Sequence, residues 1–162
     1  GDKTSKVYMK NLYVSGTPQF AGTFGVRYFI DYWFLGANLN AFGRNYIDVA
    51  PARRMEGIYN TVDPTLPETM DTYYAMTTQE RIGSACTLDL SVGKIFYLRN
   101  RQSINFNLSV NNVLNKRDIR TGGYEQARVF ASDGALVNPA LFPNKYYYMQ
   151  GINCFANISY RF

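Results

Sequence analysis

The sequence contains no histidine, and only two of its 162 residues are cysteine. Without histidine, the chain cannot build Ser-His-Asp or Cys-His nucleophilic sites, a histidine general base, or imidazole zinc sites. Cys86 and Cys154 lie far apart and form no CxxC motif, which excludes a disulfide framework and a cysteine metal site. No two carboxylates are spaced as an acid–base pair on one strand face. We therefore expect no catalytic residue, no metal, no cofactor and no enzymatic activity.

Charge is also scarce, because charged residues make up only 18% of the chain against roughly 25% in average soluble proteins. The formal net charge is +5, but the basic residues are scattered and their tightest cluster spans only 116–120. Nucleic-acid binding, which needs a basic patch on a recognition fold, is therefore not expected. Runs of about 18 apolar residues are missing as well, which excludes a transmembrane helix.

Apolar and polar residues alternate through most of the chain, and this period of two predicts β-strands. In the run 20–30, Phe24, Val26 and Tyr28 fall on one face, and Thr23 and Arg27 on the other. The strands are predicted at about 6–14, 20–30, 33–45, 85–98, 103–113 and 147–162, and the run at 6–14 alternates poorly. No stretch has helical periodicity, so the sequence predicts an all-β fold of about six antiparallel strands.

Several of these runs are longer than the ~5–6 residues of a soluble strand and match the ~9–11 residues of a tilted transmembrane strand. The connections alternate between short turns, at 31–32 and 99–103, and long loops, at about 46–84 and 114–146. Outer-membrane barrels have short periplasmic turns and long external loops. We therefore predict an antiparallel transmembrane β-barrel segment with two long extracellular loops.

Two other architectures fit the same alternation. A soluble β-sandwich binding module also has one apolar and one polar face. A complete small outer-membrane structural or adhesion barrel of about eight shorter strands would need two strands within the loops, and a weak hairpin around Ser132-Asp133-Gly134 would supply them. Both remain open on the sequence.

Strand parity assigns the side chains to two faces of the predicted barrel wall. The apolar face, with aromatic residues near the strand ends, is predicted to contact lipid. The polar face is predicted to contact the hydrated lumen, through Arg27, Asp89, Asn105, Asn107 and Asn157, together with Lys94. Cys86 and Cys154 share the lipid-facing parity on strands separated by a third strand, a distance too great for a disulfide, so both are expected to be free thiols.

Two segments, LSVNNVLNKRDIRTGGYEQ and FPNKYYYMQGINCFANISYRF, resemble the carboxyl terminus of SusC-like TonB-dependent outer-membrane transporters. The upstream segments VYMKNLYVSGTPQ, YWFLGANLNAFGRNYID and QERIGSACTLDLSVGKIF agree with this family in its order. The resemblance implies nutrient uptake across the Gram-negative outer membrane, of glycans, peptides or chelates, through a plugged barrel of about 22 strands. A SusD-like surface lipoprotein and the TonB complex of the inner membrane are its expected partners.

The chain has room for about six of those strands and contains neither a plug nor a TonB-binding segment. Six strands are too few to close around packed side chains, and hydrocarbon does not tolerate open sheet edges. We therefore expect a barrel fragment whose further partners are the rest of the barrel, the plug and membrane lipid. The TonB complex would act through the missing N-terminal part.

Two groups of residues are predicted to make contacts. The long loops carry residue types that often dominate interfaces or stack on sugars, and ligand or partner contact is predicted for Arg53, Arg54, Tyr124, Glu125 and Arg128. The last strand carries Ile158, Tyr160 and Phe162, predicted to be an assembly signal that the barrel-insertion machinery captures by edge pairing. The loops have opposite charge balances, 3 − 6 = −3 for 46–85 and 5 − 3 = +2 for 114–146, which would allow them to pack together. A solvated charged surface fits the same charges at least as well.

Overall fold

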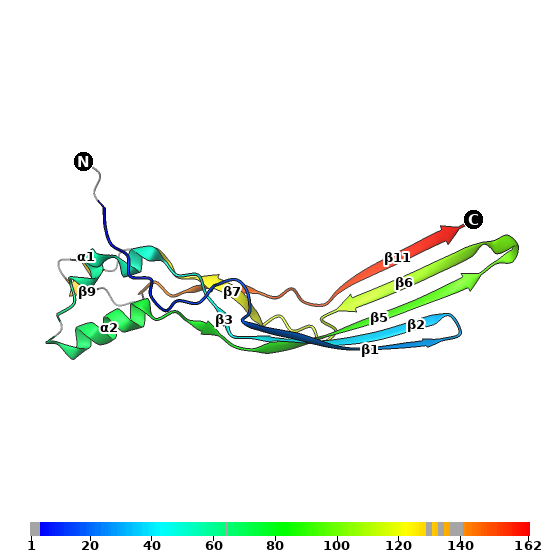
Figure 1. Ribbon diagram of the computed structural model, residues 1–162, viewed down its shortest axis with the longest axis horizontal. Helices are drawn as coiled ribbons and strands as arrows, with labels where there is room; N and C mark the ends of the chain where they lie inside the picture. The colour runs from blue at the N-terminus through cyan, green and yellow to red at the C-terminus, as the bar shows by residue number, and fades with distance from the viewer. Residues whose placement is uncertain (1–3, 64, 129–130, 133–134, 137–140) are drawn as a thin grey trace. The chain divides into compact units, whose positions relative to one another are not determined.

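The structure, a computed structural model, describes residues 4–63, 65–128, 131–132, 135–136 and 141–162. They belong to two compact units (Figure 1). The loop unit is formed within 1–17, 45–82 and 120–147, and the sheet unit is formed by 18–44, 83–119 and 148–162. The two long loops predicted from the sequence therefore contribute mainly to one folded body, and five of the six predicted strands mainly to the other.

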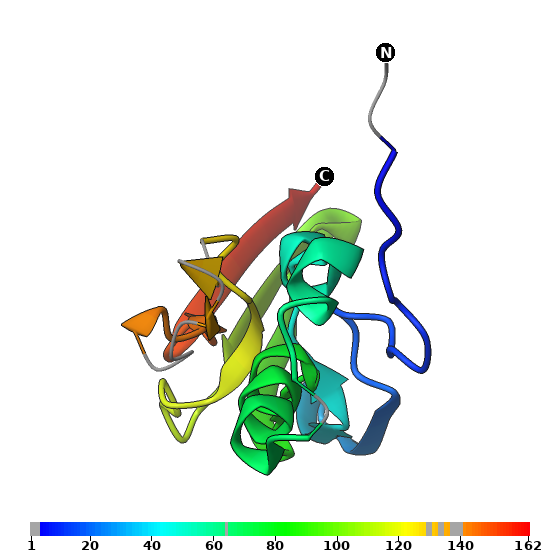
Figure 2. The same ribbon diagram turned by 90° about the vertical axis from the view of Figure 1, so that its left-hand side faces the viewer.

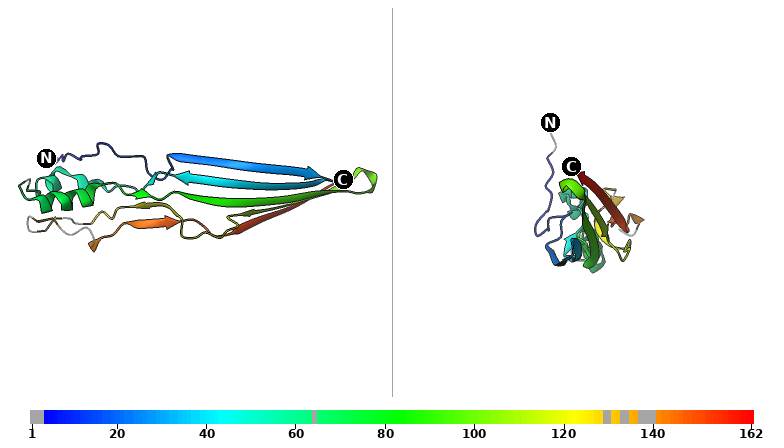
Figure 3. Two further views of the ribbon diagram at one scale, coloured as in Figure 1. Left: turned by 90° about the horizontal axis from the view of Figure 1, so that it is seen from below. Right: turned by 90° about the vertical axis from the view of Figure 1, so that its right-hand side faces the viewer.

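The sheet unit is a five-stranded antiparallel sheet in the order β1-β2-β5-β6-β11. Its strands, which lie side by side in Figure 3, are β1 (Phe20–Ile30), β2 (Trp33–Gly43), β5 (Ala85–Tyr97), β6 (Ser103–Asn111) and β11 (Asn153–Arg161). Five of the six predicted runs thus form strands with shifts of a few residues at their ends. The 147–162 run is shortened to Asn153–Arg161 in this sheet.

The short connections match the prediction. Asp31 and Tyr32 form a two-residue turn with φ of 45° and 66°, the left-handed conformation that fits the twist of a hairpin. The second turn contains a short 3-10 helix, η2 (Arg99–Arg101), and Leu98 N–H donates to the Gln102 carbonyl at 2.8 Å. Both turns join neighbouring strands at the same end of the sheet.

The prediction of a strand at 6–14 is wrong. Val7 makes an isolated antiparallel bridge with Met55, Tyr8 N–H donates to the Arg54 carbonyl at 2.9 Å, and Asn11 interrupts the extended chain with a φ of 61°. The segment therefore contacts the loop unit and adds no strand to the sheet. Because this segment belongs to no sheet, it has no apolar and polar strand faces that would require its residues to alternate.

The loop unit also departs from the all-β prediction, because it contains helices (Figures 1 and 2). They are η1 (Pro51–Arg54), α1 (Glu56–Tyr59) and α2 (Pro67–Thr77). Helix α2 begins at a proline, carries Glu68 in its first turn, and buries Tyr73 and Met76 three residues apart. Only two apolar positions of this helix are buried, which is too few to give a helical period in the sequence.

Three small two-stranded sheets complete the described part of the chain: β3 (Asn45–Tyr46) with β4 (Arg81–Ile82), β7 (Arg120–Tyr124) with β10 (Lys145–Tyr148), and β8 (Ala131–Ser132) with β9 (Ala135–Leu136). The last pair is the hairpin expected within the second loop, although its central residues 133–134 lie outside the described residues.

Burial differs sharply between the units. The buried hydrophobic residues of the loop unit are Ile47, Ala50, Tyr73, Met76 and Ile82, whereas the described part of the sheet unit buries only Ile119. Among the described residues, no second layer covers either face of the five-stranded sheet, and the sheet does not close into a barrel. Neither the eight-stranded barrel nor the sandwich is therefore the architecture of the described chain.

Candidate functional site

One face of the sheet is apolar along its whole length. The register aligns Phe24, Leu39 and Leu88 across β1, β2 and β5, and Val92, Leu108 and Ala156 across β5, β6 and β11. Many of these side chains are open to the surroundings, including Phe24 and Ile158, which are 71% and 70% exposed. A contiguous apolar surface of this kind marks contact with a membrane or another protein.

Lys94 also lies on this face, which corrects its prediction as a lumen residue. It is the direct cross-strand partner of Trp33 and Phe106 and shares the parity of Leu90, Val92 and Phe96. Its Nζ atom is 4.3 Å from the Trp33 ring centroid and 5.3 Å from that of Phe96. Assigning Lys94 to the polar face because of its charge was therefore wrong. Its position in the alternation of the strand would have placed it on the apolar face.

The opposite face carries the polar positions. Arg27, Asp89, Asn105, Asn107 and Asn157 all have this second parity, as predicted. Thr23 Oγ1 donates to Asn40 Oδ1 at 2.9 Å, and Asn40 Nδ2 donates to Asp89 Oδ2 at 2.7 Å. Side chains on three neighbouring strands are thus joined by hydrogen bonds across the sheet, which satisfies much of their polarity.

Glycines shape a shallow hollow of about 290 Å³ on the polar face. Gly36 and Gly93 line it: a Cβ atom on Gly36 would collide with Ser91 Oγ, and one on Gly93 would lie 2.5 Å from Asn107 Oδ1. The absence of side chains at these glycines leaves room for the polar side chains of the neighbouring strands. Arg27 lines the same hollow.

Two asparagines that the sequence did not single out fix the chain between β6 and β11. Asn112, with a φ of 51°, donates from Nδ2 to the Lys116 and Gln150 carbonyls, both at 2.9 Å. Asn115 Oδ1 accepts from the Ile152 backbone N–H at 3.0 Å. The NNVLNK segment that carries part of the family resemblance therefore has a structural role here. Its signal in the sequence was the repeated asparagine, a residue that tolerates left-handed backbone.

The edge strand β11 carries the predicted assembly signal. Ile158, Tyr160 and Phe162 are 70%, 53% and 95% exposed, and Ile158 and Tyr160 pair with Phe106 and Ile104 on the apolar face. Only one side of β11 is paired in the described chain, because it is the last strand of the sheet order. The opposite backbone edge is therefore free to accept another strand.

In the loop unit, Arg54 and Glu125 form a buried ion pair between the two long loops. Arg54 Nη1 and Nη2 lie 2.6 and 2.8 Å from the two carboxylate oxygens of Glu125, and both side chains are 2% exposed. The Ala50 N–H also donates to Glu125 Oε2 at 2.9 Å, and Arg54 Nη2 donates to the Thr77 carbonyl at 2.5 Å. These two residues therefore tie the loops together and are inaccessible to a ligand.

The other three predicted contact residues have different surroundings. Arg53 is 3% exposed and donates to the carbonyls of Gln126 and Phe142, both at 3.2 Å, while its burial lowers the pKa of its guanidinium. Tyr124 is 40% exposed, and Arg128 is also exposed, with its guanidinium 5.5 Å from the centroid of the Phe142 ring. Of the five predicted residues, only Tyr124 and Arg128 are therefore open to a partner.

The loops do pack together, which their opposite net charges had left open, but the buried contact has the reverse polarity. Its arginine comes from the acidic loop and its glutamate from the basic loop. The pair with the expected polarity, Arg120 with Glu80, is exposed and spans 3.5 Å. The net charges of the loops therefore do not identify which residues form the buried ion pair, because local geometry decides which charges become buried.

Glu80 and Gln79 form a second set of ties that the sequence did not reveal. Glu80 accepts hydrogen bonds from the Tyr146 hydroxyl, at 2.8 Å to Oε2, and from Asn144 Nδ2 at 2.7 Å. Gln79 Nε2 donates to the carbonyls of Tyr13 and Ile47, both at 3.0 Å. The tyrosine triplet 146–148 of the family resemblance thus includes one residue that holds the loop unit together.

Three tyrosine rings of the loop unit contact one another in a row. The ring centroids of Tyr8 and Tyr59 are 5.5 Å apart, as are those of Tyr59 and Tyr73. Tyr8 and Tyr59 are 45% and 46% exposed, and Tyr73 is buried, which raises the pKa of its hydroxyl.

Cys86 and Cys154 are both free in the structure, as predicted. The described residues contain no group of three or more histidine, cysteine, aspartate or glutamate side chains arranged to hold a metal ion. None of the described helices is long and apolar enough to cross a membrane.

Comparisons with protein-family models, with curated proteins and with solved structures return no match.

Proposed function

We propose that this chain is the carboxyl-terminal portion of a SusC-like TonB-dependent transporter in the bacterial outer membrane. Its five-stranded sheet would be one arc of a barrel of about 22 strands, and the loop unit would belong to the external loops. The function of the whole protein would be active uptake of a nutrient such as a glycan, a peptide or a chelate.

One observation carries the membrane part of this proposal. A single-layer sheet with strands of 9 to 13 residues presents one continuous apolar face and one hydrogen-bonded polar face, and neither face is covered within the described chain. The wall of a wide transmembrane barrel has this arrangement, because it separates lipid from a hydrated lumen. A soluble sheet would need a second layer on its apolar face.

Within the described part of the chain, the outer edges of β1 and β11 are unpaired, which supports an incomplete arc. Open strand edges are costly in hydrocarbon, so the proposal requires pairing with further strands of the same barrel. The barrel-insertion machinery would capture β11 first, through its free edge and through Ile158, Tyr160 and Phe162. The SusD-like lipoprotein, the plug and the TonB complex enter the proposal through the family resemblance alone.

The transmembrane orientation of the sheet is testable with adjacent residues of β6. Leu108 lies on the apolar face and Ser109 on the polar face, near the middle of the strand. We would replace each with cysteine in a protein that lacks Cys86 and Cys154, in cells that assemble the full protein carrying this chain. Labelling would compare a water-soluble maleimide with a lipid-soluble maleimide.

We expect the water-soluble reagent to label Ser109→Cys and to leave Leu108→Cys unmodified, while the lipid-soluble reagent labels Leu108→Cys. Detergent solubilisation should then expose both thiols equally. Equal labelling of the two cysteines by the water-soluble reagent in intact membranes would rule out a membrane-spanning sheet.

A further inference from the structure

Lys94 is the only charged residue on the apolar face of the five strands. It lies in β5 between Trp33 of β2 and Phe106 of β6, both of which are apolar, and no carboxylate shares this face of the sheet. Lys94 forms no salt bridge with any of the described residues. A cation in such a position is costly unless its ammonium group reaches a polar or anionic group outside the sheet.

The surroundings of Lys94 allow its ammonium to reach outward. The four-carbon stem is half-buried against the sheet, and Nζ is 4.3 Å from the Trp33 ring centroid and 5.3 Å from that of Phe96. The two ring faces attract the cation without neutralising it. Trp33 is the first residue of β2, and Phe96 is the second last of β5, so this site lies near the end of the sheet that carries the short turns.

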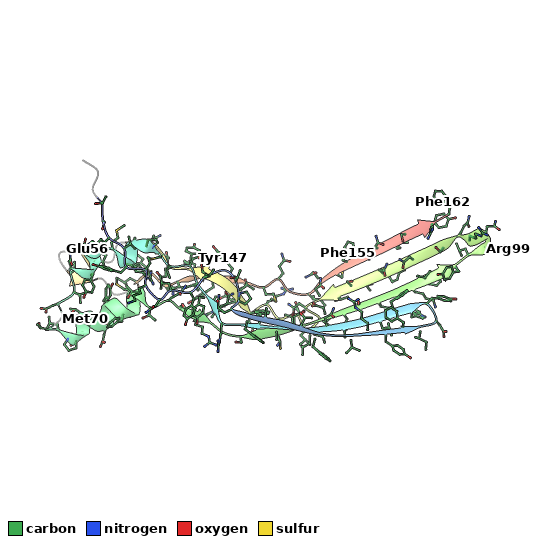
Figure 4. All side chains as sticks on the ribbon, in the orientation of Figure 1. Glu56, Met70, Arg99, Tyr147, Phe155 and Phe162 are labelled. Carbon is green, nitrogen blue, oxygen red and sulfur yellow. The ribbon has the colours of Figure 1, made fainter. Side chains whose placement is uncertain are left out.

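The same end of the sheet is basic. Arg99 and Arg101 lie in the turn between β5 and β6, and Arg161 ends β11, whereas Asp31 is the one acidic residue of the two short turns. Figure 4 shows Arg99 and Phe162 at this end. Four basic groups against one acidic group, together with an aromatic border, match the electrostatics of an anionic membrane surface.

We propose that Lys94, held between Trp33 and Phe96, binds the phosphate group of an anionic phospholipid at the turn side of the membrane. The inference rests on the proposed function, because the apolar face must contact lipid for the phosphate to be within reach. The acyl chains would cover Val92 and Leu108, and Arg99 and Arg101 would contribute long-range attraction. The site would favour an anionic headgroup over a zwitterionic one.

Trp33 is the only tryptophan of the chain and stands beside Lys94, so its fluorescence reports on this site alone. The full protein that carries this chain, with its other tryptophans replaced by phenylalanine, would be placed in micelles of a zwitterionic detergent that contain a small fraction of brominated phospholipid. Bromine quenches indole fluorescence only at close range. The measurement compares brominated phosphatidylglycerol, which is anionic, with brominated phosphatidylcholine, which is zwitterionic.

We expect phosphatidylglycerol to quench Trp33 at no more than about one fifth of the concentration that phosphatidylcholine requires, since Lys94 alone contributes about a fivefold preference at an anionic surface. Lys94→Gln should lower the preference about fivefold, to the part that Arg99 and Arg101 contribute, and Lys94→Arg should restore it. Lys10→Gln removes the same charge from an exposed residue of the loop unit and should leave the preference unchanged.

The remaining outcomes separate the two proposals. Equal quenching by both lipids, or a preference that Lys94→Gln leaves unchanged, would overturn the phosphate site while leaving a lipid-facing sheet intact. No quenching by either lipid would overturn the phosphate site and would also contradict the membrane orientation on which the proposed function depends.

Discussion

The loop unit and the sheet unit are held together by different means. The loop unit has a small apolar core, around Ile47 and Met76, and a buried ion pair between Arg54 and Glu125. The sheet unit has long strands, continuous backbone pairing and almost no buried apolar side chain. One chain therefore contains a unit that buries its apolar residues internally and a unit that presents them outward.

This difference indicates where each unit obtains its stability. Burial of apolar surface stabilises a folded body by roughly 25 cal/mol per Å², and the loop unit uses that source internally. The sheet unit leaves the same kind of surface uncovered, so its stability depends on the surrounding lipid or on another layer. Substitutions in the two units should therefore respond differently to the presence of a membrane.

The largest expected effect is the loss of the buried ion pair. Arg54→Gln leaves the Glu125 carboxylate buried without its bidentate partner, and we expect the loop unit to lose about 3–5 kcal/mol of stability. Hydrogen–deuterium exchange of segments 45–63 and 120–128 would measure the loss. Arg120→Gln breaks the exposed pair with Glu80 and should cost less than about 1 kcal/mol, so equal costs would contradict the buried role of Arg54.

A somewhat smaller effect is expected from a charge on the apolar face of the sheet. Leu108→Arg should weaken membrane association of the sheet unit by about 2–4 kcal/mol, because arginine is costly at the centre of a bilayer. Urea titration of the full membrane-bound protein that carries this chain would measure the loss. Ser109→Arg places the same charge on the polar face as the matched control, and a similar loss in both variants would argue against two chemically distinct faces.

A loss of about 1 kcal/mol is expected from Tyr146→Phe, which removes the hydroxyl that donates to Glu80 at 2.8 Å. Exchange protection of the segment around Glu80 should fall, while the sheet unit stays unchanged. Tyr147→Phe alters an exposed neighbour of the same type and should have little effect. Unchanged protection in Tyr146→Phe would show that the hydrogen bond contributes nothing to the loop unit.

The smallest effect concerns pH. The side chain and the backbone N–H of Thr65 donate to Asp63, which lowers the pKa of Asp63 below its ordinary value of 3.8. A lowered folded-state pKa means that this contribution is present above pH 3.8 and is lost as the pH falls through the folded-state pKa. NMR titration of the Asp63 carboxyl carbon should give a midpoint below 3.8, and Thr65→Ala should move it upward.

Much of the sheet unit was predictable from the sequence. Five strand runs, both short turns and the shared face of Arg27, Asp89, Asn105, Asn107 and Asn157 followed from a period of two. Lys94 was misassigned because its charge was given more weight than its parity. The loop unit was harder, since α2 buries only Tyr73 and Met76 and the segment 6–14 pairs with a distant loop.

By itself, the sequence determined which side chains share a face of each long strand, because backbone pleating alternates them whatever surrounds the sheet. Only the tertiary structure decided that Arg54 and Glu125 become buried partners, since 71 residues separate them and no local period links them. It also decided that the apolar face of the sheet stays uncovered within the described chain. Local geometry acts over a few residues, whereas burial depends on which distant segments meet.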